Sequence, residues 1–135
     1  MNISNLTVLA DYLEGVDDNF FDMGSFFYRR NTSFSELIKT ETTYALTGNL
    51  PECGTTACAL GYGPAAGFPM TKDESKRLNW PGYCERVFSL SLGYTNREWF
   101  WCFSANWART QPTAKEAAAR IRTLITTGVP DDYEG

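Results

Sequence analysis

The chain has 135 residues, of which 43% are hydrophobic, 15% aromatic and 21% charged, with a formal net charge of −4. A chain of this length and composition buries enough apolar surface to fold, which argues against intrinsic disorder, and no stretch approaches the ~20 apolar residues of a membrane span. Histidine is absent, which excludes His-based acid–base catalysis, His-activated nucleophiles and His-ligated metal sites.

Charge is distributed unevenly along the chain. Residues 1–67 carry three basic and eight acidic side chains, a net charge of −5, whereas residues 68–135 carry nine basic and eight acidic ones, a net charge of +1. Nucleic-acid backbones are bound through basic patches, so we expect no nucleic-acid partner. The acidic half either serves solubility alone or docks on a basic protein.

The first 15 residues have neither the basic region nor the long apolar region of a signal peptide. We therefore expect a cytoplasmic protein whose cysteines are reduced. The same residues predict a helix, because apolar side chains recur at i, i+3, i+4 and i+7: Leu6, Leu9, Ala10 and Leu13. Ser4 or Asn5 would cap this helix and Gly15 would end it.

The next 40 residues give weaker signals. Residues 15–32 are expected to be irregular. A helix is predicted to begin at Ser33, with Glu36 as its capping-box partner. Residues 40–52 are rich in Thr and contain a turn signal at Gly48, which favours a short β-hairpin.

Two helices are predicted in the middle of the second half. The first covers Gly82–Leu92 and ends at Gly93. The second begins at Thr95, with Glu98 as its capping-box partner. Residues 99–103 of this helix are apolar nearly all round, which indicates a central or interfacial position.

The C-terminal helix has the clearest signals. Thr113 and Glu116 match a capping box, and Gly128 with Pro130 ends the helix. Apolar residues on one of its faces recur at helical spacing: Ala114, Ala117, Ala118, Ile121, Leu124 and Ile125. Together these elements predict one compact, mainly α-helical domain, residues 1–135, of about five or six helices with a short β-hairpin.

The segment 53–67, CGTTACALGYGPAAG, consists almost entirely of small residues. Thr55 or Thr56 would cap a helix whose first turn contains Cys58. Small residues let neighbouring backbone approach closely, so one interpretation is tight helix packing. The other is that Gly54, Thr55 and Thr56 offer N–H groups and hydroxyls to an anion or ligand at a helix N-terminus.

Residues 53–61 of this segment resemble a Cys-Gly-Thr-x-Ala-Cys-x-x-Gly motif of small uncharacterised proteins from bacteriophages and bacteria. The stretches Phe21-Asp22-Met23, Pro112-Thr113 and Gly128-Val129-Pro130 resemble the same group. The resemblance implies a phage or mobile-element origin, and it implies no activity and no role for any residue.

The chain has four cysteines: Cys53, Cys58, Cys84 and Cys102. They lack the close CxxC pairs of structural zinc sites, so we predict no metal site. A catalytic thiol would need a helix N-terminus to lower the pKa of Cys53 or Cys58. The acidic pairs at 17–18 and 131–132 lie in turn or tail contexts and are expected to be solvated. We predict no catalytic residues, no cofactor and no enzymatic activity.

Aromatic residues provide the remaining binding candidates. Trp99 and Trp107 stand in a stretch with other large aromatic residues, and one helix cannot turn all of them into a single core. Either that helix is buried on all sides, or Trp99 and Trp107 form a stacking pocket for a nucleobase-like ligand or a hot spot for a protein.

A second aromatic patch lies upstream and includes two cations: Phe26, Phe27, Tyr28, Arg29 and Arg30. Tyr and Arg side chains together suit a protein-binding hot spot or a phosphate-bearing ligand. The alternative is a packed loop.

Two functions remain after these exclusions. The first is a non-enzymatic phage-type accessory protein that binds and modulates a host protein of the bacterium, such as a defence or regulatory factor. The second is a binder or sponge of a small nucleotide-derived signalling ligand. For that ligand, aromatic rings would stack on the base, while Gly54–Thr56 and Arg29 or Arg30 would hold phosphate.

Overall fold

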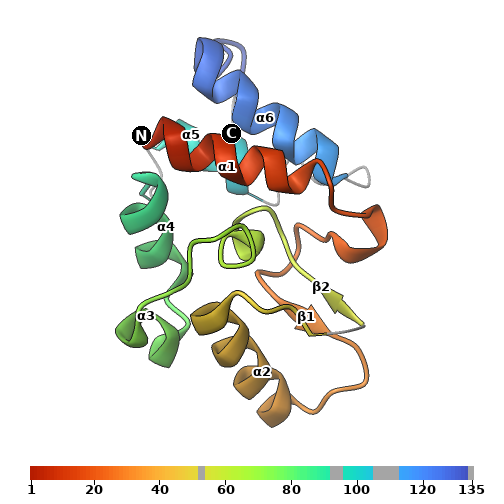
Figure 1. The fold of residues 1–135 in the computed structure, drawn as a ribbon. Helices are drawn as coiled ribbons and strands as arrows, with labels where there is room; N and C mark the ends of the chain where they lie inside the picture. Colours follow the sequence, from red (N-terminus) through yellow and green to blue (C-terminus); the bar gives the residue numbers. More distant parts are fainter. Residues whose placement is uncertain (52–53, 92–95, 105–112, 134–135) are drawn as a thin grey trace.

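The computed structural model describes residues 1–51, 54–91, 96–104 and 113–133 (Figure 1). These described residues form six α-helices, two short 3₁₀ helices and one two-stranded antiparallel sheet. The predicted mainly α-helical fold class is therefore confirmed.

Four helices form the upper part of the molecule as drawn in Figure 1. Helix α1 (Ile3–Leu13) packs along α6 (Ala114–Thr127), and α5 (Arg97–Phe103) packs against α6. Helix α4 (Trp80–Phe88) contacts α1. Each apolar face predicted for α1 and α6 is the face that is buried, because these two helices pack against each other through it.

The lower part consists of α2 (Phe34–Thr47), α3 (Lys72–Arg77) and the sheet (Figure 1). Strand β1 (Tyr28–Arg29) pairs with β2 (Thr55–Thr56), with Tyr28 opposite Thr56 and Arg29 opposite Thr55. The predicted hairpin within residues 40–52 is wrong, because the sheet partners lie on either side of α2.

Helix α2 extends through the Thr-rich stretch in place of that hairpin. Ser33 caps it by accepting a hydrogen bond from Glu36 N at 3.2 Å, as the sequence predicted. Threonine hydroxyls then donate to carbonyl oxygens four residues earlier, as Thr40 does to Glu36 at 2.9 Å. The helix ends at Gly48, whose φ of +75° suits glycine.

The N-cap residues of three helices lie at, or within a few residues of, the positions predicted from the sequence. Asn2, rather than Ser4 or Asn5, caps α1, and Asn96 caps α5 by accepting from Trp99 N at 3.2 Å. Thr95, the predicted cap, lies outside the described residues. Thr113 caps α6 as predicted, by accepting from Glu116 N at 3.1 Å.

Helix α4 begins earlier and ends earlier than predicted. Asn79 caps it by accepting from Gly82 N at 3.0 Å, and Ser89 ends it in a left-handed conformation with φ of +55°. Its Trp80 is buried and stacks on Phe26 with ring centroids 5.5 Å apart. The Trp80 indole also donates to the Glu41 carboxylate at 2.8 Å, which ties α4 to α2.

The small-residue segment does not form the predicted helix. Gly54 has φ of +75°, and the two threonines after it belong to β2. The amides of Ala57 and Cys58 donate to the carbonyls of Phe20 and Ser25 at 3.3 and 3.0 Å. A short 3₁₀ helix, η2 (Leu60–Tyr62), follows. Backbone pairing with residues 20–29 thus takes the place of helical hydrogen bonds.

Candidate functional site

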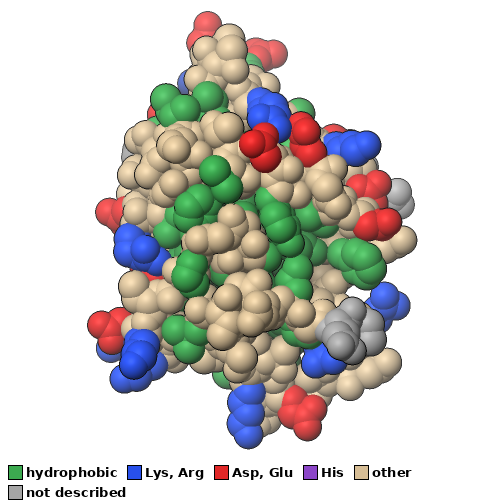
Figure 2. All heavy atoms as spheres, viewed as in Figure 1, with side chains coloured by type: hydrophobic (Ala, Val, Ile, Leu, Met, Phe, Trp, Pro, Cys, Tyr) green, Lys and Arg blue, Asp and Glu red, His purple; other side chains and the backbone are tan. Residues whose placement is uncertain are grey.

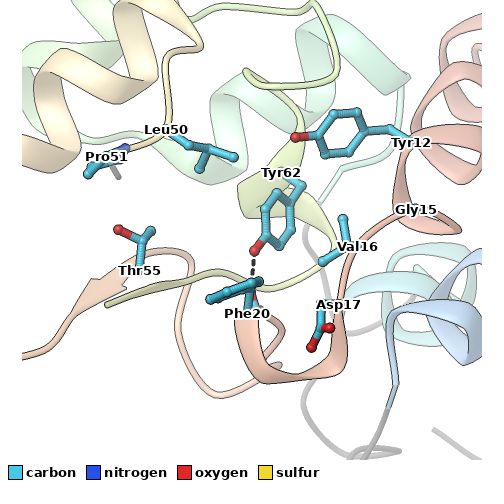
Figure 3. Close-up of a pocket in the computed structure, with 9 residues that line it drawn as sticks. All are labelled: Tyr12, Gly15, Val16, Asp17, Phe20, Leu50, Pro51, Thr55 and Tyr62. Carbon is cyan, nitrogen blue, oxygen red and sulfur yellow. Dashed lines mark hydrogen bonds between the residues drawn. The ribbon is translucent and has the colours of Figure 1, made fainter. Parts of the chain in front are cut away.

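An open pocket of about 640 Å³ lies where α1, β2, η2 and the loop after α2 meet (Figure 3). This volume lies within the range of about 300–1,000 Å³ that is usual for ligand sites. The residues that form it are mostly apolar or aromatic. Tyr12 comes from α1, Phe20 from η1 (Asp18–Phe20) and Leu50 from the loop after α2.

Two tyrosines form one wall of the pocket. The rings of Tyr12 and Tyr62 lie with their centroids 5.9 Å apart at 38°. The Tyr62 hydroxyl donates to the backbone carbonyl of Phe20, whereas the Tyr12 hydroxyl makes no hydrogen bond with any described residue and points toward Leu50 (Figure 3). Burial raises the pKa of both phenols, so both rings are neutral at physiological pH.

The pocket opens onto an apolar area of the surface. Phe20 is 46% exposed and Leu50 is 37% exposed. Figure 2 shows hydrophobic side chains gathered in the middle of this face, with charged side chains along its border. Asp17, at the start of η1, is the one charged residue among the described residues that line the pocket, and its Oδ1 accepts a hydrogen bond from Asn19 N at 2.9 Å.

One of the site residues predicted from the sequence, Thr55, lines this pocket. Its side chain is buried, and its hydroxyl has no hydrogen-bond partner among the described residues. Gly54 and Thr56, which the sequence grouped with Thr55 in one ligand site, are not among the residues that line this pocket. Because Thr55 lies in a strand, the helix N-terminus on which the second interpretation of residues 54–56 depended is not present there.

The patch predicted at residues 26–30 is divided between core and surface. Phe27 is 4% exposed and stacks on Tyr44 with centroids 5.2 Å apart, and Phe26 is partly buried against Trp80. Both phenylalanines therefore contribute to the core rather than to an exposed contact surface. Tyr28 is exposed.

The two arginines of that patch border a separate, polar cavity. Arg29 and Arg30 line about 520 Å³ of space together with Gly54 and Glu36. Neither guanidinium forms an ion pair or hydrogen bond with a described residue. Gly54 is thus grouped with the arginines, and Thr55 with the aromatic pocket.

Of the two tryptophans predicted to form a binding site, the structure describes Trp99. Trp99 is buried and packs edge-on against Phe100 and Phe103, at centroid distances of 5.7 and 6.3 Å. Trp107 lies outside the described residues. The Arg120 guanidinium lies over the ring of Trp101, on the same helix as Trp99, with its Cζ atom 4.0 Å from the ring centroid. The described part of this helix is not buried on all sides, because Arg97 and Glu98 are exposed, but its aromatic side chains pack against neighbouring residues.

The three described thiols are buried: Cys58, Cys84 and Cys102. Burial raises the pKa of Cys58 to about 11 and that of Cys84 to about 12. The lowered pKa that a catalytic thiol at Cys58 would need is therefore not found, because burial outweighs the backbone hydrogen bonds at the start of η2. Cys53 lies outside the described residues. Within the described ranges, no three Cys, Asp or Glu side chains are grouped to hold a metal ion.

Sequence reasoning missed most residues of the aromatic pocket. Tyr12, Phe20, Leu50 and Tyr62 come from four segments, and no motif links them. One local signal existed. Tyr12 directly precedes Leu13 on α1, which places its ring at the edge of the buried face.

Comparison with protein-family models, curated proteins and solved structures found no match for this chain. The resemblance to phage and bacterial proteins therefore stays a prediction from the motif. No helix among the described residues has the length and apolar character needed to cross a bilayer.

Proposed function

We propose that this chain is a non-enzymatic, phage-type accessory protein that binds and modulates a bacterial host protein in the cytoplasm. The observation that carries this proposal is the open aromatic pocket, with Phe20 and Leu50 exposed beside it. Protein interfaces concentrate their binding energy in a few apolar or aromatic contacts seated in such pockets, surrounded by a polar rim.

Charge supports a basic partner. The half of the chain that supplies the pocket, residues 1–67, has a net charge of −5, and Asp17 lies in the pocket lining. Complementary charge speeds encounter and disfavours wrong partners. A host protein with a basic docking segment fits this surface.

The described chemistry supports binding rather than catalysis. The buried thiols have raised pKa values and stay protonated at neutral pH. The acidic pairs at 17–18 and 131–132 are exposed, as the sequence predicted.

Pocket substitutions test this proposal. The partner is captured from bacterial lysate on the wild-type protein, identified, purified and titrated against each variant by calorimetry. We expect Phe20→Ala and Leu50→Ala to weaken binding at least about tenfold, since hot-spot truncations exceed about 1.4 kcal/mol. The matched control is Phe34→Ala, because Phe34 is 77% exposed and does not line the pocket.

The control distinguishes binding at this pocket from non-specific binding to any exposed aromatic side chain. Phe34→Ala is expected to change affinity less than twofold. Equal affinity for wild type and both pocket variants, or equal loss in the Phe34 variant, would contradict the proposal. Circular dichroism melting of each variant shows whether the fold is retained.

A second candidate function rests on the arginine cavity. Arg29 and Arg30 have no described partner and border the turn at Gly54, which suits a phosphate-bearing, nucleotide-derived ligand. None of the described residues that line this cavity is aromatic, so base stacking has no support from them. Thermal stabilisation by guanosine monophosphate, lost in Arg30→Ala but kept in the control Arg97→Ala, would favour it. No stabilisation would count against it.

A further inference from the structure

The described lining of the aromatic pocket combines three aromatic rings with one acidic side chain. Three rings face it from three elements: Tyr12 of α1, Phe20 of η1 and Tyr62 of η2 (Figure 3). The faces of aromatic rings carry negative partial charge, so groups of rings attract cations that come within about 6 Å of a ring centroid.

Formal charge among the described residues of the pocket lining has a single sign. Asp17 is acidic, and none of the described lining residues is Lys or Arg. One Asp17 carboxylate oxygen accepts from Asn19 N at 2.9 Å, and the other accepts no hydrogen bond from a described residue. A phosphate or carboxylate would meet repulsion here, whereas a cation would be attracted by the rings and by the Asp17 carboxylate, which lies at the border of the pocket and points away from Tyr12 (Figure 3).

The lining offers both aliphatic contact and hydrogen-bond acceptors, which is what a side chain with an apolar stem and a cationic head requires. Leu50 and Val16 supply aliphatic contact, and the Tyr12 hydroxyl is a free acceptor. Lys and Arg side chains have an apolar stem and a cationic head that donates several hydrogen bonds. An apolar side chain would fill the volume but would offer no hydrogen bond to the second Asp17 carboxylate oxygen or to the Tyr12 hydroxyl.

We infer that the pocket formed by Tyr12, Asp17, Phe20 and Tyr62 takes a cationic side chain, arginine or lysine, from the protein partner. This inference rests on the proposed function and specifies which chemistry of the partner is recognised. The occupant is a protein segment, because the pocket is open and continuous with exposed Phe20 and Leu50, which offer contact beyond one side chain.

Three small probes test the inference on the full chain. N-acetyl-argininamide, its neutral near-isostere N-acetyl-citrullinamide and apolar N-acetyl-norleucinamide are titrated, with the ring signals of Tyr12, Phe20 and Tyr62 followed by NMR. We expect saturable shifts with argininamide and binding about fivefold weaker with citrullinamide.

Asp17→Asn tests the charge contribution. Asn also accepts at a helix N-cap, so the turn at η1 is retained. We expect this variant to bind argininamide about fivefold more weakly, with norleucinamide unaffected. The matched control is Asp132→Asn, because Asp132 is exposed in the C-terminal turn, and it is expected to behave as wild type.

Two results would overturn the inference. One is citrullinamide or norleucinamide binding as tightly as argininamide, or an arginine preference unchanged in Asp17→Asn. The other is no shift of the three rings with any probe. In either case Phe20→Ala still decides the proposed function separately. If that variant weakens the partner complex while these probes fail, the pocket binds a neutral group instead.

Discussion

A methyl group at Gly63 would overlap the hydroxyl of Tyr83. That hydroxyl is fixed, because it donates to the carbonyl of Phe68 at 2.6 Å. Gly63 is thus required because the buried ring of Tyr83 packs against its backbone. Gly61 is more restricted still, because its Cβ would overlap the backbone carbonyl oxygen of Phe26.

The first prediction concerns that overlap. Gly63→Ala should lower the free energy of unfolding by about 1–3 kcal/mol, as overpacked cores do. In a Tyr83→Phe background the loss should be smaller by at least about 0.5 kcal/mol, because the hydroxyl is gone. Urea denaturation measures both. The control is Gly15→Ala, whose Cβ would lie 3.6 Å from the Tyr12 carbonyl oxygen, an ordinary contact. Additive losses would contradict the explanation.

The second prediction concerns a buried hydroxyl. Tyr44 donates to the Gly61 carbonyl at 2.7 Å and accepts from Ala65 N at 3.3 Å. Tyr44→Phe should lower the free energy of unfolding by about 1–3 kcal/mol, because two backbone groups lose a partner. Tyr12→Phe is the matched control, since that hydroxyl bonds to no described residue. Equal effects of the two variants on urea denaturation would refute the assignment.

The third prediction concerns the aromatic patch near residue 27. Phe27→Ala should destabilise the fold by about 3–5 kcal/mol, because a buried ring stacked on Tyr44 is removed. Tyr28→Ala, beside it and 46% exposed, should cost no more than about 1 kcal/mol. Thermal melting distinguishes the two. An unchanged melting temperature for the Phe27 variant would show that this residue is not part of the core.

The fourth prediction concerns pH. Burial raises the pKa of Glu41, and the hydrogen bond from Trp80 only partly opposes this. A carboxyl whose folded pKa is raised favours the folded state when protonated, and this contribution is lost as pH rises through the folded pKa. Glu41→Gln keeps an acceptor for the Trp80 indole and removes the charge from this half-buried side chain.

Glu41→Gln should therefore raise the melting temperature at pH 7. Its advantage should shrink as pH falls through the raised pKa of Glu41 and vanish below the ordinary value of about 4.3. Melting curves of both proteins across this window provide the measurement. The matched control is Glu36→Gln on the exposed face of the same helix. A variant less stable than wild type at pH 7 would contradict the argument.

Helices α1 and α6 could be predicted from sequence because their signals are local. The spacing of Leu6, Leu9 and Leu13 defines one face, and Thr113 with Gly128 marks the two ends of α6. These features depend on residues three or four positions apart, so no distant contact is needed to interpret them. The hairpin prediction failed because the Thr-rich stretch had a strong cap at Ser33 and continued the helix.

The sequence by itself determined the fold class, the helix faces, the absence of histidine chemistry and the acidic first half. Only the tertiary structure decided that Thr55 and Thr56 form a strand, since their partner strand lies 26 or more residues earlier. The pocket is likewise a tertiary property. Tyr12, Phe20 and Tyr62 meet there because the backbone of residues 54–58 pairs with residues 20–30, and no local pattern encodes that pairing.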